Sequence, residues 1–359
     1  MKLCIISNFG PPHCGGSEEV IKNISQCLVN CYDYDVTIFA KNYNKPSFWE
    51  GIRLKPCPKG NALISELNNF DHIFVYSDSF WEIEAILNNL DRIKSKISLA
   101  LVGAYFLQKN PKYLEILKNN IDKFNLITHS SITPDYKWCI DNDLPVTVIP
   151  NGVNLSEFQN NTINFREKYS IKEKYIILSV GNFFYGKGFE LLPEIAKRFK
   201  NKDVIIISIS NTIKYPYDLT FLNKTKRQSK GLNVRFFRDL PREDVVSAFN
   251  ASDILFLPSK KEVAPLVLLE ARASKTQWIS MRVGNAEEVP GGHATMSPKE
   301  DDKGYKIMDK LLIDWLAISI CEPLENNKIK KRRVSLGQQD IQKIDWKNIV
   351  PEYDRVFKI

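Results

Sequence analysis

Residues 254–274 read Ile254-Leu-Phe-Leu-Pro258-Ser-Lys-Lys-Glu262-Val-Ala-Pro265-Leu-Val-Leu-Leu-Glu270-Ala-Arg-Ala-Ser274. The apolar run over 254–259 predicts a buried strand, and residues 265–274 predict a helix. Proline suits the first helical position, because the N–H that it lacks would have no helical partner there. A strand, a loop and a helix in this order are typical of an α/β fold.

Similar units recur on both sides of this stretch. We expect strands at 2–7, 35–40, 72–77, 97–102, 126–131 and 146–150, and again at 175–181, 203–210, 234–238 and 277–282. Helices are predicted at 17–31, 188–200, 242–252 and 297–320. Apolar strands that alternate with helices favour parallel sheets covered on both faces, which bind ligands at the carboxyl ends of their strands. We therefore predict two doubly wound α/β domains, with the second beginning near residue 158.

Composition supports a globular protein of two domains. The chain has 359 residues, of which 43% are hydrophobic and 26% are charged. Its seven cysteines lack the paired spacing of a metal site, so we expect reduced thiols. The apolar stretch at the N-terminus is too short for a signal peptide, and no run reaches the roughly 20 apolar residues of a membrane span. We therefore expect a cytoplasmic location.

The net charge of +8 comes partly from two basic clusters, Lys224–Lys230 and Lys328–Arg333. Each cluster alone fits a solvated helix end. The alternative is attraction to phosphate, either on an anionic ligand or at a membrane face to which the protein binds peripherally. We expect no nucleic-acid partner, because aromatic and basic residues do not interleave as they do in nucleic-acid-binding modules.

Two glycine-containing loops follow predicted strands. In the first, Gly15 and Gly16 precede a helix, where backbone N–H groups can approach an anion. The alternative is a plain turn in which Ser17 caps the helix. The second, 181–188, nearly matches a P-loop, but Gly188 replaces the hydroxyl residue that would hold magnesium. We exclude an NTPase and keep Lys187 as a residue placed to neutralise a phosphate.

Glu262 and Glu270 stand eight positions apart across the predicted loop-to-helix junction. Ionised carboxylates only accept hydrogen bonds, which suits the hydroxyl groups of a sugar. The N–H groups near Val263, Ala264 and Leu266 would face the sugar or the phosphates of the same ligand. The alternative is a pair of surface glutamates.

We predict no metal site. Asp33-Tyr-Asp35 and Asp141-Asn-Asp143 match an Asp-x-Asp metal motif. That motif belongs at the end of a strand, whereas Asp33–Asp35 precede one. Both stretches are better explained as turns.

Four motifs in this order resemble glycosyltransferase family 4. They are Gly15-Gly16, Ile149-Pro-Asn-Gly-Val153, Val180-Gly181 with Lys187-Gly188, and Glu262-x7-Glu270. The resemblance implies a GT-B fold: an N-terminal Rossmann-like acceptor domain over 1–157 and a Rossmann-like donor domain over 158–335 face a cleft, and a helix over 336–359 crosses back to the first domain. It also implies retaining, metal-independent transfer of a sugar from a nucleotide diphosphate donor to the hydroxyl of a glycan or lipid-linked acceptor, without a cofactor.

The resemblance also assigns roles to residues. Glu270 would hold the ribose of the donor. Two residues would be catalytic: Glu262 would contact the transferred sugar, and Lys187 would bind the diphosphate and stabilise the charge that develops as it leaves. Gly15 and Gly16 would leave space for the donor. Asn182, Val263, Ala264, Pro265 and Leu266 would line the donor site.

Two departures from the family pattern leave alternatives open. Asn182 stands where the family usually has an arginine, and Leu101–Tyr105 lacks the histidine that many members carry. His13 or His129 would be substitutes, although a lone histidine is more often structural. The alternative function is a nucleotide-sugar-binding GT-B protein with lost or altered catalysis, such as an epimerase or a phosphorylase.

Overall fold

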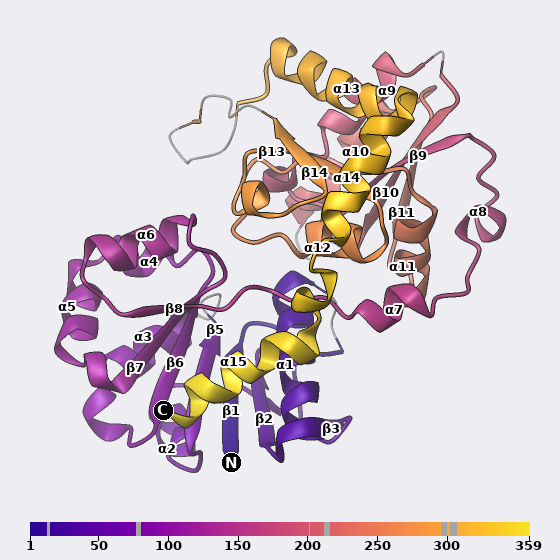
Figure 1. The fold of residues 1–359 in the computed structure, drawn as a ribbon. Helices are drawn as coiled ribbons and strands as arrows, with labels where there is room; N and C mark the ends of the chain where they lie inside the picture. The colour runs from indigo at the N-terminus through magenta and orange to yellow at the C-terminus, as the bar shows by residue number, and fades with distance from the viewer. Residues whose placement is uncertain (13–14, 77–79, 201, 212–215, 296–299, 302–306) are drawn as a thin grey trace. The chain divides into compact units, whose positions relative to one another are not determined.

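The computed structural model describes residues 1–12, 15–76, 80–200, 202–211, 216–295, 300–301 and 307–359. These residues form two compact units (Figure 1). Unit 1 comprises Met1–Gly152 and Ile344–Ile359, and unit 2 comprises Val153–Lys343. The C-terminal segment therefore returns to the unit in which the chain begins.

Unit 1 is built on an eight-stranded sheet in the order β3-β4-β2-β1-β5-β6-β7-β8. All neighbours are parallel except β3 and β4, which are antiparallel. The strands are β1 (Lys2–Ser7), β2 (Asp35–Ala40), β3 (Ser47–Trp49), β4 (Ile52–Pro56), β5 (His72–Tyr76), β6 (Lys96–Leu101), β7 (Phe124–Thr128) and β8 (Val146–Val148). Its helices are α1 (Gly16–Tyr32), α2 (Asn61–Leu67), α3 (Phe80–Leu87), α4 (Tyr105–Gln108), α5 (Pro111–Asn119), α6 (Pro134–Asp141) and α15 (Trp346–Lys358).

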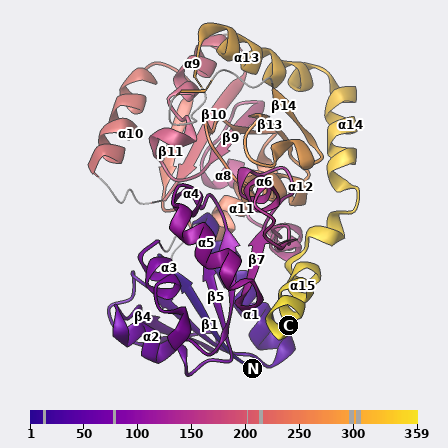
Figure 2. The same ribbon diagram turned by 90° about the vertical axis from the view of Figure 1, so that its left-hand side faces the viewer.

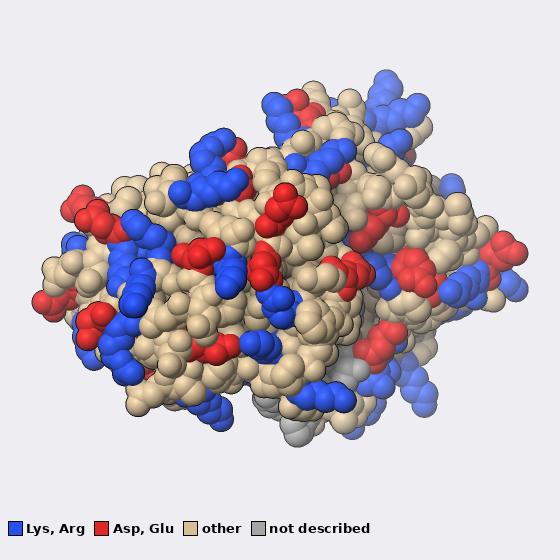
Figure 3. Space-filling view, turned by 90° about the horizontal axis from the view of Figure 1, so that it is seen from below, with Lys and Arg blue, Asp and Glu red and all other residues tan. Residues whose placement is uncertain are grey.

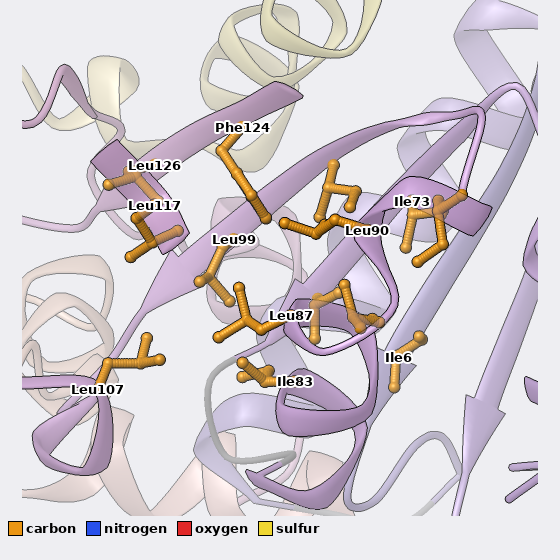
Figure 4. Packing of buried hydrophobic residues seen from close by; sticks show 14 of the residues in the cluster. Ile6, Ile73, Ile83, Leu87, Leu90, Leu99, Leu107, Leu117, Phe124 and Leu126 are labelled. Carbon is orange, nitrogen blue, oxygen red and sulfur yellow. The ribbon is translucent and has the colours of Figure 1, made fainter. Parts of the chain in front are cut away.

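Both faces of this sheet are buried, as alternate residues of β5 show. Ile73 and Val75 join the cluster that includes Ile83 and Leu87 of α3 (Figure 4). Phe74, which points to the other face, packs against α15 with its ring 5.8 Å from that of Tyr353. Figure 2 shows α3 and α15 on opposite sides of the sheet. Side chains of a strand alternate between its faces, so a continuously apolar strand needs a cover on each.

Unit 2 has a six-stranded parallel sheet in the order β11-β10-β9-β12-β13-β14. The strands are β9 (Tyr175–Val180), β10 (Val204–Ser210), β11 (Val234–Arg238), β12 (Ile254–Leu257), β13 (Gln277–Met281) and β14 (Gly292–Thr295). The helices are α7 (Leu155–Gln159), α8 (Phe165–Lys168), α9 (Leu191–Arg198), α10 (Pro216–Gln228), α11 (Arg242–Ala251), α12 (Leu266–Ala273), α13 (Lys310–Glu325) and α14 (Asn327–Gln338). The chain adds β10 and β11 on one side of β9 and then places β12 on the other. Strand order therefore reverses between β9 and β12.

The structure corrects several expected boundaries. The helix predicted over 297–320 begins at Lys310, because the Asp309 side chain accepts a hydrogen bond from the N–H of Leu312 (2.8 Å) and caps it there. Residues 300–301 and 307–309 are not helical, and the rest of 297–306 lies outside the described residues, as does residue 77 of the predicted third strand. Pro265 is the N-cap of α12 rather than its first helical residue. Gly15, not Ser17, is the N-cap of α1.

Strands β3, β4 and β14 were not predicted, and helices α2 to α8, α10 and α14 had no predicted range. Within the described ranges, no helix is both long and apolar enough to cross a membrane.

Candidate functional site

The reversal of strand order in unit 2 brings two loops together. Strands β9 and β12 are parallel neighbours, and the Ser179 hydroxyl donates to the carbonyl of Phe256 (2.6 Å). The loop that follows β9 and the loop that follows β12 therefore leave the same edge of the sheet. In open α/β sheets this switch point is where ligands bind.

Backbone contacts hold the two loops against each other. The N–H of Lys260 donates to the carbonyl of Gly186 (2.8 Å). Gly188 has φ +66°, and a Cβ there would lie 1.9 Å from the carbonyl oxygen of Pro258. Only glycine fits this backbone conformation and this close approach.

Lys187 and Glu262 meet between these loops. Lys187 ends a short 3-10 turn, Tyr185–Lys187, and its Nζ lies 2.6 Å from Oε1 of Glu262. The carboxylate side chain is only 10% exposed and the lysine side chain 23%. The structure thus places together a cation and a carboxylate that the sequence predicted for adjacent parts of one ligand.

A second lysine, not singled out from the sequence, is buried beside this pair. Lys260 is 3% exposed. Its ammonium group forms an ion pair with Glu190 and lies 3.4 Å from the ring centroid of Tyr185. Lys260 therefore links the loop after β12 to the loop after β9. Its position two residues before Glu262 was the one signal in the sequence that could have identified it.

Glu270 lies in the second turn of α12 and is 7% exposed. Its Oε1 accepts a hydrogen bond from NH1 of Arg242 at 2.5 Å. Nε of the same arginine donates to Oε2 of Glu157 at 2.9 Å. Sequence reasoning missed Arg242 and Glu157, which lie 28 and 113 positions from Glu270.

Residues 263–265, which follow Glu262, form the end of the loop that leads into α12. A third loop packs on them: the N–H of Asn285 donates to the carbonyl of Val263 (2.9 Å). Ala264 and Leu266 are half-buried. Pro265, the N-cap, has no side-chain acceptor, so the first N–H groups of the helix are left to other partners. This helix N-terminus can therefore complement an anion.

The remaining predicted site residues, Asn182, Gly15 and Gly16, take no part in the ion pair between Lys187 and Glu262. Asn182 is exposed and brings no charge to the loop after β9. Gly15 and Gly16 belong to unit 1. A Cβ on Gly15 would lie 2.2 Å from a carboxylate oxygen of Glu18, whereas a Cβ on Gly16 would meet nothing within 4 Å.

His129 is not placed to act as a general base. His129 is 2% exposed and its ring contacts the Tyr76 hydroxyl (3.1 Å) and the Ile149 carbonyl (2.9 Å). Burial lowers its pKa to about 4, so the ring is neutral at physiological pH. His129 is a structural histidine, and His13 lies outside the described residues.

Asp33 and Asp143 have left-handed backbone conformations with φ of 55° and 57°, as in turns. Across the ranges that the structure describes, no group of three or more His, Cys, Asp or Glu side chains could hold a metal ion.

Comparisons with known proteins show similarity to glycosyltransferases. Residues 161–330 match the family model described as glycosyl transferases group 1. An uncharacterized glycosyltransferase of Methanocaldococcus jannaschii is 28% identical over 228 residues, which cover 60% of this chain and 54% of that protein. The D-inositol 3-phosphate glycosyltransferase of Corynebacterium diphtheriae is 29% identical over 177 residues, 45% of this chain and 38% of that protein. These alignments thus span about half or less of either relative.

Solved structures resemble the whole chain. The sucrose-phosphate synthase of Thermosynechococcus elongatus has a TM-score of 0.75 at 16% identity, covering 99% of this chain and 98% of its own. Anabaena HepE in complex with UDP-glucose has a TM-score of 0.75 at 15% identity, covering 100% and 99%. The chain therefore has the GT-B fold of two parallel-sheet α/β units, and its residues 161–330 are similar to glycosyl transferases group 1.

Proposed function

We propose that this protein transfers a sugar from a nucleotide diphosphate sugar to a hydroxyl group of an acceptor, with retention at the anomeric carbon and without a metal ion. The observation that carries the proposal is the ion pair of Lys187 with Glu262 at the switch point of unit 2, where Glu270 lies in the second turn of the following helix. Because the solved structure of HepE contains UDP-glucose, UDP sugars are the first donors to test.

In the proposed complex each part of the donor has its own contact. Glu270 accepts hydrogen bonds from the ribose hydroxyls, and Lys187 with the N-terminus of α12 binds the diphosphate. Glu262 contacts the transferred sugar. The bond that breaks joins the sugar to the diphosphate. The 2.6 Å contact between Lys187 and Glu262 supports roles for these two side chains at adjacent parts of the donor, the diphosphate and the sugar.

In the chemical step, the bond between the anomeric carbon and the diphosphate oxygen breaks, and its electron pair stays on that oxygen. The acceptor oxygen bonds to the anomeric carbon on the face from which the diphosphate leaves. The acceptor's hydroxyl proton passes to the leaving diphosphate oxygen, so no side chain is needed as a base. Lys187 stabilises the negative charge that develops, the contribution that a divalent cation makes in other enzymes.

The acceptor is proposed more broadly as a glycan or a lipid-linked hydroxyl. Lys328, Lys331 and Arg332 are exposed at helical spacing on one side of α14. We propose that this basic side contacts an anionic membrane surface peripherally. All cysteines among the described residues are free thiols, which supports a reducing cytoplasmic location.

We expect no nucleic-acid partner. On the face drawn in Figure 3, Lys and Arg side chains are interspersed with Asp and Glu. This mixture does not make the one-signed stripe that phosphate backbones favour.

A second candidate function rests on Asn182. Its side chain is exposed and uncharged, so the diphosphate would have one cationic contact fewer in this loop than the family pattern provides. A protein that binds a nucleotide sugar without transferring it, or an epimerase or phosphorylase, is the alternative.

The test has two stages. Melting temperatures are first measured with UDP, GDP, ADP and CDP sugars, because a bound donor raises apparent stability. The stabilising donor is then incubated with acceptor extracts in the presence of EDTA, and the anomeric configuration of the product is determined by NMR. We expect transfer with retention. Inversion, or loss of turnover in EDTA that magnesium restores, would contradict the mechanism. Binding without transfer to any acceptor would favour the second candidate.

A further inference from the structure

We propose that Arg242 is a positioning residue that fixes the carboxylate of Glu270 for ribose, and so makes the site select ribonucleotides over 2′-deoxyribonucleotides. This inference rests on the proposed function, because it presumes that Glu270 holds the donor ribose. It adds two side chains, Arg242 and Glu157, that none of the motifs in the sequence includes.

The guanidinium group lies between two carboxylates. Arg242 is the first residue of α11. Its NH1 is 2.5 Å from Oε1 of Glu270, and its Nε and NH2 are each 2.9 Å from Oε2 of Glu157. The side chains are 29% exposed for Arg242, 10% for Glu270 and 22% for Glu157. Solvent therefore screens these contacts less than it screens a surface ion pair.

Packing fixes the guanidinium group from a third side. Its carbon lies 5.7 Å from the ring centroid of Phe158. Phe158 is 4% exposed and its ring lies 6.0 Å from that of Phe249 on α11. Asn250 of α11 donates to the carbonyl of Phe158 (3.0 Å). Helices α7 and α11 thus hold Arg242 in one place, and Arg242 in turn holds Glu270.

The chemistry of the carboxylate explains why fixing Glu270 favours ribose binding. An ionised carboxylate has about four lone-pair sites. One guanidinium N–H can therefore occupy one site while neighbouring ribose hydroxyls donate to others. A carboxylate held in one rotamer does not lose rotamer entropy when ribose binds. Without Arg242, the largely buried carboxylate of Glu270 loses this charged contact, and its side chain is held less firmly toward the ribose.

Arginine is required for this bridge rather than any cation. Its planar fork presents several N–H donors in fixed directions, so it reaches two carboxylates at once. A lysine keeps the charge but presents a single ammonium group. Arg242→Lys should therefore keep part of the preference for ribonucleotides that Arg242→Ala loses.

The test compares UDP with 2′-deoxy-UDP by isothermal titration calorimetry, or the corresponding pair for whichever base stabilises the wild-type protein most. We expect the wild-type protein to prefer the ribonucleotide by about 10-fold or more, the value of a hydrogen bond to a charged group. Arg242→Ala should bring this ratio close to one by weakening UDP while leaving 2′-deoxy-UDP within about 3-fold. Glu157→Gln and Arg242→Lys should give intermediate ratios.

Two controls separate positioning from folding. Arg198→Ala is a matched variant, because Arg198 also joins two elements, through Asp314 (2.6 Å), and is 26% exposed. It lies in the last turn of α9, shortly before β10 begins, and so near the amino ends of the strands rather than their carboxyl ends. Its replacement should leave the ratio unchanged. In the double variant with Glu270→Gln, Arg242→Ala should lower the ratio no further than Glu270→Gln alone, because the two residues act as one unit.

The outcomes are distinguishable. If no nucleoside diphosphate binds the wild-type protein, the proposed function itself fails. If the wild-type protein binds UDP without preferring it to 2′-deoxy-UDP, or if Arg242→Ala weakens both ligands equally or neither, the positioning role is wrong while donor binding stands.

Discussion

Nζ of Lys187 lies 2.6 Å from Oε1 of Glu262, and this ion pair joins two loops that are 75 positions apart in the sequence. Both loops leave neighbouring strands at the point where the strand order of unit 2 reverses. The pair therefore depends on the topology of the sheet. Because Lys187 already contacts the carboxylate of Glu262, an anionic ligand that binds Lys187 contacts an ammonium group that keeps this partner.

Lys187→Ala should lower the turnover number about 10²- to 10³-fold, the usual effect of removing a group that stabilises developing charge. The variant also leaves the 10%-exposed carboxylate of Glu262 without its ammonium partner, so the melting temperature should fall. Adding Glu262→Gln should recover the melting temperature but not the turnover. Recovery of both would show that Lys187 is only structural.

Gly188→Ala should destabilise unit 2 strongly. The left-handed backbone costs about 1–2 kcal/mol for a residue with a Cβ, and that Cβ would also lie 1.9 Å from the carbonyl oxygen of Pro258. Gly231→Ala is the control, because Gly231 has φ +78° and open space around it. Urea unfolding should show a much larger loss for Gly188→Ala. Equal losses would refute the close approach of the two loops.

Lys260→Met should cost stability because it leaves Glu190 without its cation. Breaking a buried ion pair costs about 3–5 kcal/mol, and since the Glu190 side chain is 25% exposed we expect about half of that. The double variant Lys260→Met with Glu190→Gln should recover much of the loss in a thermal melt. A double variant as unstable as the single one would mean that Lys260 acts through its contact with the Tyr185 ring rather than through its ion pair with Glu190.

His129 should make unit 1 less stable as the pH falls. Burial lowers its pKa from 6.5 to about 4, so the unfolded chain takes up the proton first. The stability from this residue is therefore present above pH 6.5 and is lost between pH 6.5 and 4. At pH 5 the loss should be about 2 kcal/mol relative to pH 8. Urea titrations at the two pH values should show a smaller pH dependence for His129→Gln, and an unchanged one would contradict the assignment.

The central strands were predictable because they are continuously apolar. Strands β1 and β2 match their predicted ranges, and β12 ends two residues before the predicted end. The edge strands β3 and β14 were missed for a physical reason. Strand β3 is three residues long and largely exposed, and β14 reads Gly-His-Ala-Thr, with no apolar run. Such strands form because their backbone hydrogen-bonds to a neighbouring strand. The local sequence pattern does not reveal this pairing.

The candidate site divides in the same way. Local spacing indicated Glu262, Glu270 and Lys187. It could not indicate Arg242 as a neighbour of Glu270, because folding rather than spacing brings these two side chains together. For Lys260 it gave only the position two residues before Glu262. The ion pair of Lys260 crosses from the loop after β12 to Glu190. For charged residues that are far apart in the sequence, the pairing cannot be predicted until the order of the strands in the sheet is known.

The most direct test of the donor site is calorimetric titration of a UDP sugar into the wild-type protein, Lys187→Ala and Glu270→Gln, repeated with GDP, ADP and CDP sugars. We expect one of these donors to bind the wild-type protein, and its affinity to fall about 10-fold or more in each variant, because each loses a charge-assisted contact. Arg198→Ala should bind as the wild-type protein does. A wild-type protein that binds none of these donors, or variants that bind as tightly as the wild type, would contradict the assignment of this site.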